Sequence, residues 1–87
     1  MSNNFLLKEF GDRIRQLRTQ EKLSQERLSY KTGFHRTYIG MIERGERNIS
    51  LTNMAIFAKV FNLTIDELLK FDNSKELQKQ YKLKTKD

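Results

Sequence analysis

The residues best suited to bind another molecule lie between positions 25 and 48 of this 87-residue sequence. Arg36, Thr37 and Arg44 fall on one side of a helix expected over about residues 36–44, because each residue advances about 100° around a helix. A guanidinium can bind two acceptors at once, and a threonine offers a hydroxyl and a methyl group. Such groups can bind base edges and phosphates, so the pattern predicts a nucleic-acid-binding surface.

Four residues of the helix over 36–44 are predicted to face the bases of a duplex: Arg36, Thr37, Gly40 and Met41. Arg36 lies in the first turn, where its guanidinium could bind O6 and N7 of one guanine. Thr37 could offer its methyl group to a thymine or its hydroxyl to a phosphate. Gly40 and Met41 are expected to govern how closely the helix approaches the bases.

Six residues are predicted to contact phosphates: Gln25, His35, Tyr38, Arg44, Arg47 and Asn48. Gln25 begins a predicted helix, where the backbone amides and the helix dipole favour an anion. His35 is expected to be an N-cap or a neighbour of a phosphate. Tyr38 lies at the edge of the apolar face, so core packing and a phenol–phosphate bond are compatible roles for it.

Apolar spacing and capping signals predict five short helices within residues 5–71. Leu7, Phe10, Ile14 and Leu17 form one apolar stripe of the first helix. The predicted elements are a helix over about 5–21, one over 25–32 capped by Ser24 and ended by Gly33, one over 36–44 stopped by Gly45, one opened by Ser50, and one opened by a Thr64–Glu67 capping box and containing Leu68 and Leu69.

The second and third predicted helices have the spacing of a helix-turn-helix. With Gln25 as the first of twenty positions, the small residue Ser29 is fifth and Gly33 is ninth. A small residue is needed where the two helices cross, and a glycine is needed in the turn. The expected apolar anchors are Leu28, Phe34, Ile39 and Ile42.

Composition narrows the possible functions. The sequence has 17 Lys and Arg against 11 Asp and Glu, a formal charge of +6 that favours a polyanionic partner. It has no Cys and one His, so we expect no metal site and a cytoplasmic location, and no cofactor is expected. No nucleophile, base and orienting group are grouped as in an enzyme, so we expect no catalytic activity. No apolar run approaches the roughly 18 residues of a membrane span, and the first residues do not resemble an export signal. We therefore expect a protein that is neither exported nor membrane-spanning.

The stretch from Phe10 to Leu69 resembles the phage repressor and Cro-like (XRE-like) helix-turn-helix family. Within it, residues 35–39 (HRTYI) and 42–48 (IERGERN) are similar to the controller proteins of restriction–modification systems. The resemblance implies an all-α, compact five-helix, lambda-repressor-like domain. It also implies a buried ion pair between Arg18 and Glu43 that positions the helices without reading bases.

One helix covers too few base pairs to find a site, so helix-turn-helix proteins bind as pairs. The fourth and fifth predicted helices carry more large apolar groups than one subunit can easily bury. We therefore predict a homodimer on an inverted-repeat, double-stranded DNA operator. Its predicted interface residues are Phe57, Phe61, Leu63, Leu68, Leu69 and Phe71.

The leading hypothesis is a transcription regulator. The resemblance to controller proteins implies action on its own promoter and on an endonuclease gene, as an activator at low occupancy and a repressor at high occupancy. RNA polymerase is then a candidate partner. The alternatives are a phage or plasmid repressor of the same fold and an antitoxin-like protein-interaction module.

The sequence is predicted to divide into a DNA-binding and dimerisation domain over 1–71 and a basic tail over 72–87. The tail contains few apolar residues and several lysines. It could be a solvated tail, a short helix or a cationic arm that adds non-specific attraction to phosphates.

Overall fold

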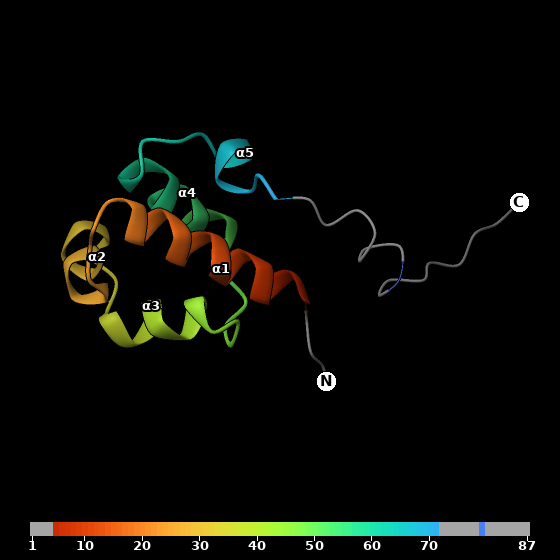
Figure 1. Ribbon diagram of the computed structural model, residues 1–87, viewed down its shortest axis with the longest axis horizontal. Helices are drawn as coiled ribbons and strands as arrows, with labels where there is room; N and C mark the ends of the chain where they lie inside the picture. Colours follow the sequence, from red (N-terminus) through yellow and green to blue (C-terminus); the bar gives the residue numbers. More distant parts are fainter. Residues whose placement is uncertain (1–4, 72–78, 80–87) are drawn as a thin grey trace, which may run out of the picture.

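The computed structural model describes residues 5–71 and residue 79, and these residues form helices and turns with no strand. The helices are α1 (Phe5–Gln20), α2 (Gln25–Thr32), α3 (Arg36–Glu43), α4 (Leu51–Val60) and α5 (Ile65–Leu68). α1 runs through the middle of the bundle, with α3 along one side of it and α4 and α5 on the other (Figure 1). The prediction of an all-α domain of five helices is confirmed.

Side-chain caps begin four of the helices, three of them with the hydroxyl of a serine or threonine. The hydroxyl of Ser24 accepts from the N–H of Arg27 at 3.0 Å, and Ser50 caps α4 in the same way at 3.1 Å. At α5, Thr64 and Glu67 form the predicted capping box, with side chain to backbone distances of 2.9 and 3.3 Å. Each cap pairs an amide that the helix itself leaves without an acceptor, which fixes where the helix starts.

Two helices end slightly earlier than predicted. α3 ends at Glu43, and Arg44 is its C-cap. The N–H of Arg44 donates to the carbonyls of Gly40 and Ile42. α5 ends at Leu68, and the predicted helical residue Leu69 is its C-cap. These tightened last turns satisfy carbonyls at the helix ends and redirect the chain.

The core lies between α1 and the other helices. Phe57 is completely buried, and its ring packs against Phe10 and Phe34 at centroid distances of 6.4 and 5.2 Å. The buried apolar residues are Phe10, Ile14, Leu17, Leu28, Ile39, Ile42, Ile49, Phe57, Ala58, Phe61 and Leu68. Every helix contributes to this set, so the bundle is held by one shared core.

The predicted dimer interface needs a correction. Phe57 and Leu68 are fully buried and Phe61 is 5% exposed within the single chain, so these three side chains belong to the subunit's own core and are not available to a partner. Leu63 and Phe71 are partly buried at the edge of the core, and Leu69 is 38% exposed. Apolar spacing alone could not separate the two groups, because it does not show which face α1 covers.

α1 and α3 approach each other very closely at Gly11. A Cβ atom at this position would lie 2.3 Å from the carbonyl oxygen of Ile42 and 2.7 Å from that of Glu43. No residue larger than glycine fits there without moving one of the helices. Gly11 therefore permits the close crossing that fixes the end of α3.

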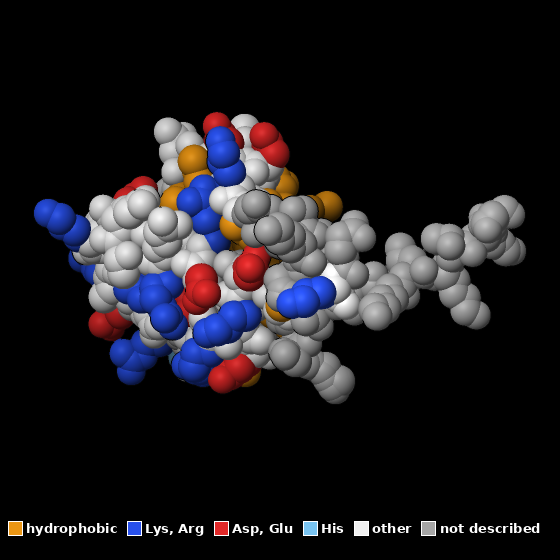
Figure 2. All heavy atoms as spheres, turned by 45° about the vertical axis from the view of Figure 1, so that its right-hand side comes forward, with side chains coloured by type: hydrophobic (Ala, Val, Ile, Leu, Met, Phe, Trp, Pro, Cys, Tyr) orange, Lys and Arg blue, Asp and Glu red, His pale blue; other side chains and the backbone are white. Residues whose placement is uncertain are grey.

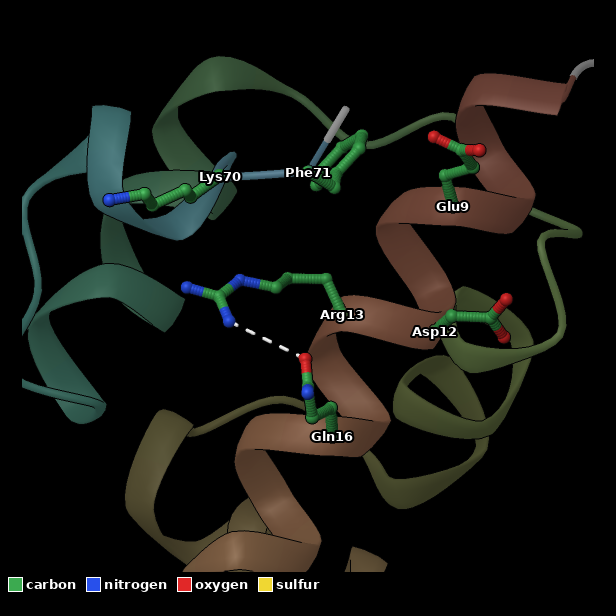
Figure 3. Close-up of a pocket in the computed structure, with 6 residues that line it drawn as sticks. All are labelled: Glu9, Asp12, Arg13, Gln16, Lys70 and Phe71. Carbon is green, nitrogen blue, oxygen red and sulfur yellow. Dashed lines mark hydrogen bonds between the residues drawn. The ribbon is translucent and has the colours of Figure 1, made fainter. Parts of the chain in front are cut away.

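Arg13 joins α1 to α5. Its guanidinium donates to the carbonyl oxygens of Glu67 at 2.7 Å and Leu68 at 3.0 Å, at the end of the short α5. Figure 3 shows Arg13 directed from α1 toward α5, in a pocket that Gln16 of α1 and Phe71 after α5 also line. A cation near the last carbonyls of a helix is favourable, so Arg13 anchors α5 on the bundle.

The described residues include no helix that is long and apolar enough to cross a membrane. The predicted basic tail, residues 72–87, lies outside the described residues apart from Lys79, which is exposed. The predicted division at residue 71 stays a prediction.

Candidate nucleic-acid interface

The turn between α2 and α3 has the geometry expected of a helix-turn-helix. Gly33 adopts a left-handed conformation with φ of 83°, and its N–H donates to the carbonyl of Ser29 at 2.8 Å. The Thr32 hydroxyl accepts from the N–H of Phe34 at 3.1 Å, and the Phe34 side chain packs against the core. These bonds close α2 and direct the chain into α3.

His35 begins α3 as its N-cap. Its Nδ1 atom accepts from the N–H of Thr37 at 3.0 Å. The capping role predicted for His35 is confirmed, and its exposed side chain stays next to the first turn of α3.

The outer face of α3 is largely the predicted one. Arg36, Thr37 and Arg44 are exposed, and Met41 is half-buried. Gly40, however, is buried, because the side chains of Gln25 and Arg44 cover it. Gly40 still lines the space between the start of α2 and α3, and its place opposite the bases stays a prediction. A helical projection places a residue on a side but cannot show that a neighbouring helix covers it.

A groove of about 580 Å³ separates the start of α2 from the outer face of α3. The residues that line it are Arg36, Thr37, Gly40 and Arg44 on the α3 side, Ser24, Gln25 and the acid Glu26 on the α2 side, and Arg18 of α1. The first-turn amides of α2 thus lie beside the predicted base-reading residues. A helix N-terminus next to exposed guanidinium groups favours a bound phosphate.

Two exposed guanidinium groups, those of Arg36 and Arg44, line this groove, and further cations lie on α2 and in the turn after α3. The exposed cations of α2, α3 and the following turn are Arg27, Lys31, Arg36, Arg44 and Arg47. Figure 2 shows Lys and Arg side chains over the lower part of one face, with acidic side chains between them. The charge of this part of the chain is positive, as attraction to a polyanion requires.

Glu43 is the acid of α3, and it is completely buried. Its carboxylate accepts from Arg18 at 2.6 and 3.0 Å, from Gln25 at 3.0 Å and from Arg15 at 3.4 Å. Burial by itself raises the pKa of Glu43, but the bonds from Arg18 and Gln25 and the charge of Arg18 outweigh it and hold the pKa below its ordinary value. The ion pair between Arg18 and Glu43 is present as predicted, so this acid does not repel phosphates.

Gln25 connects the buried network to the groove. Its Nε2 atom donates to Glu43, and its Oε1 atom would lie 3.5 Å from a Cβ at Gly40. The Gln25 side chain therefore extends from the start of α2 to α3 and is held there by Glu43. A phosphate contact of Gln25 stays a prediction, and its backbone position beside the groove favours it.

Arg44 and Glu46 form an exposed ion pair. Arg44 Nε and Nη2 donate to the two carboxylate oxygens at 3.0 and 3.1 Å. The bond and charge of Glu46 raise the pKa of Arg44, and Arg44 in turn lowers the pKa of Glu46. The predicted phosphate-binding guanidinium is thus already occupied by an acid of the same loop.

Tyr38 belongs to α3, and its ring lies against Phe34 before the helix and Arg47 after it. Its ring meets Phe34 edge-on at a centroid distance of 5.0 Å, and the Arg47 guanidinium lies 5.2 Å from its centroid. Arg47 and Asn48 are exposed in the turn after α3, consistent with the predicted contacts to a backbone strand. Tyr38 is half-buried and packs against the core.

Sequence reasoning missed three residues that shape this surface. Arg15 adds a donor to Glu43, Asn53 donates to the Tyr38 hydroxyl, and Gly11 permits the approach of α1 to α3. A glycine inside a predicted helix is costly, so Gly11 carried a usable signal. Arg15 and Asn53 carried none, because their partners are 28 and 15 residues away.

The fold and the surface define a helix-turn-helix protein whose outer helix and neighbouring helix start share one basic groove. A helix-turn-helix family model matches residues 14–68, and the chain belongs to this family. The resemblance that the sequence suggested is confirmed.

Among named relatives, the chain is similar to restriction–modification controller proteins. It is 43% identical over 72 residues to the control protein C.BamHI of Bacillus amyloliquefaciens, covering 82% of this chain and 88% of that protein. The crystal structure of the controller protein C.AhdI from Aeromonas hydrophila matches with a TM-score of 0.68 and 45% identity, over 71% of this chain and 94% of that one.

A second solved structure concerns DNA directly. The controller protein C.Esp1396I, solved as a tetramer in complex with its natural 35 base-pair operator, matches with a TM-score of 0.69 and 31% identity. The match covers 77% of this chain and 92% of that one. The same fold therefore binds operator DNA in that relative.

Proposed function

We propose that this protein is a sequence-specific, double-stranded DNA-binding transcription regulator and serves as the controller protein of a restriction–modification system. The observation that carries the proposal is the arrangement of Arg36, Thr37 and Arg44 on the exposed face of α3, next to the start of α2. The operator complex of C.Esp1396I, a relative of the same fold, supports it.

In this proposal α3 enters the major groove. Its eight residues span about 12 Å, enough to reach only a few base pairs. Arg36 lies in the first turn, where its two-pronged guanidinium suits O6 and N7 of a guanine. Thr37 and Met41 lie on the same face and would contact neighbouring base edges.

Phosphate contacts would fix the helix in the groove. The α2 amides near Gln25 and the side chains of His35, Tyr38 and Arg44 surround α3 on the surface, and Arg47 and Asn48 continue this rim beyond it. Contacts of this kind set register and supply most of the salt-dependent affinity.

Two subunits would bind together as a homodimer. Pairing places two recognition helices in successive major grooves, about 34–36 Å apart, and gives an inverted-repeat operator. Leu63, Leu69 and Phe71 are the interface residues that we retain, since they lie at the surface beside α5. The protein would act as a cytoplasmic binding protein with no catalytic step, and RNA polymerase would be a partner when it activates transcription.

Selection of bound duplexes from a random DNA library tests the proposal. We expect enrichment of one inverted repeat, with affinity that falls steeply with salt because a dimer that contacts about 6–10 phosphates releases comparable counterions. Sedimentation should show a dimer at tens of micromolar. A library with no enriched sequence, or a binding constant insensitive to salt, would contradict the proposal.

A further inference from the structure

A single hydrogen bond connects α4 to the recognition helix. The side-chain Nδ2 of Asn53 donates to the hydroxyl oxygen of Tyr38 at 3.0 Å, across 15 residues of sequence. Both side chains are half-buried, so the bond is partly shielded from water. Among the described residues, this is the one hydrogen bond between a side chain of α4 and a side chain of α3.

The donor side of this bond is held rigidly. Asn53 lies in the first turn of α4, where its N–H donates to the cap Ser50 at 3.1 Å. One turn further along, Phe57 is fully buried in the core against Phe34. The Asn53 amide therefore projects from a fixed point of the bundle.

The acceptor side is held as well. The Tyr38 ring contacts the edge of Phe34 on one side, and the Arg47 guanidinium lies over it at 5.2 Å from the centroid. These contacts restrict where the ring can lie. The bond from Asn53 occupies a lone pair of the hydroxyl oxygen and leaves its proton for another partner.

The direction of the bond matters chemically. A phenol has one proton to donate and lone pairs that accept, whereas phosphate oxygens on DNA only accept. Asn53 supplies the proton of the Asn53–Tyr38 bond, so the phenol keeps its own proton for another partner. We infer that Asn53 is a positioning residue that holds the Tyr38 hydroxyl as a hydrogen-bond donor toward the DNA backbone.

This inference rests on the proposed function, and its test uses the duplex enriched in the selection experiment. Asn53→Ala removes the donor, and we expect operator binding to weaken about two- to tenfold, the range of one lost hydrogen bond. Asn53→Asp reverses the bond, because a carboxylate accepts the phenol proton, and we expect a loss of about tenfold or more.

Protein stability separates positioning from a general structural role. An aspartate in the first turn of α4 is favourable with the helix dipole, so Asn53→Asp should keep or raise the melting temperature while it weakens DNA binding. Thr52→Asp is the matched control, since it adds the same charge at the exposed neighbouring position. An equal loss for Thr52→Asp and Asn53→Asp would overturn the inference.

The decisive measurement is a double-mutant cycle with Tyr38→Phe, which keeps the ring and removes the hydroxyl. If Asn53 acts through that hydroxyl, Asn53→Ala in the Tyr38→Phe background should change affinity less than about twofold. An undiminished loss there would mean that Asn53 touches DNA directly, and would overturn the inference.

The two proposals fail in different ways. If the wild-type protein selects no operator, the proposed function fails. If the wild-type protein binds its selected operator and the cycle shows no coupling between Asn53 and Tyr38, the inference about Asn53 alone fails.

Discussion

The guanidinium of Arg18 and the carboxylate of Glu43 form a two-pronged ion pair that joins α1 to the end of α3. Nε lies 2.6 Å from Oε2 and Nη2 lies 3.0 Å from Oε1, and the carboxylate is fully buried. Gln25 adds a donor from the start of α2. One buried acid thus connects the three helices that carry the proposed DNA-binding surface.

Removal of the arginine should destabilise the protein strongly. Arg18→Met leaves the buried Glu43 charge with weaker partners, and we expect the free energy of unfolding to fall by about 3–5 kcal/mol. Urea denaturation followed by circular dichroism at fixed protein concentration measures it. The double variant Arg18→Met/Glu43→Leu should recover much of the loss, since it removes both charges. A loss for Arg18→Met no larger than that for Arg44→Met, which breaks an exposed pair, would contradict this role.

The same pair should make stability depend on pH. The pKa of Glu43 is lower in the folded protein than its ordinary value of 4.5. Its ionised form therefore stabilises the fold fully above about pH 4.5, and this stabilisation is lost as the pH falls through the lower folded pKa. Between pH 3 and 7, the free energy of unfolding should fall more steeply with decreasing pH for the wild type than for Glu43→Gln. Parallel profiles would refute the assignment.

Arg36 should contribute to sequence preference. Arg36→Ala should lose discrimination at one base pair of each half-site, worth about 1–3 kcal/mol, while salt-sensitive general binding persists. Repeating the DNA selection with the variant measures this change. Arg27→Ala, which removes the same charge from the exposed face of α2, should keep every base preference. An unchanged preference in Arg36→Ala would remove Arg36 from base reading.

Release of Arg44 should strengthen DNA binding. Glu46 occupies both prongs of the Arg44 guanidinium, so a phosphate must displace it. Glu46→Gln should raise affinity for a duplex about two- to fivefold at low salt, the scale of an exposed ion pair. Asp12→Asn makes the same charge change on α1 beside α5. If both variants gain equally, net charge rather than release of Arg44 explains the effect.

A methyl group at Gly11 should disrupt the crossing of α1 and α3. Gly11→Ala would place Cβ 2.3 Å from the backbone oxygen of Ile42, and we expect a loss of unfolding free energy of about 1–3 kcal/mol. Gly40→Ala is the matched control, because its neighbours are the ends of the flexible Arg44 and Gln25 side chains. Thermal unfolding should show a much smaller effect for Gly40→Ala. Comparable effects would mean that the contact at Gly11 relaxes easily.

The helix starts and the helix-turn-helix were determined by the sequence itself. Ser24, Ser50 and Thr64 cap helices with amides only a few residues away, and the left-handed Gly33 ends α2 through a bond to a residue four positions earlier. Such signals act within one turn of chain, so they can be recognised before the fold is known. The helical projection likewise placed Arg36 outside and Glu43 inside.

Burial across helices was decided only by the tertiary structure. Gly40 is covered by side chains from two directions, Phe57 and Leu68 fill the subunit core instead of an interface, and Asn53 meets Tyr38 through the placement of α4. These outcomes depend on the angle and distance at which helices cross, which are set by packing the whole core. Local sequence fixes a helix and its faces, but the neighbours that cover each face are set by the chain as a whole.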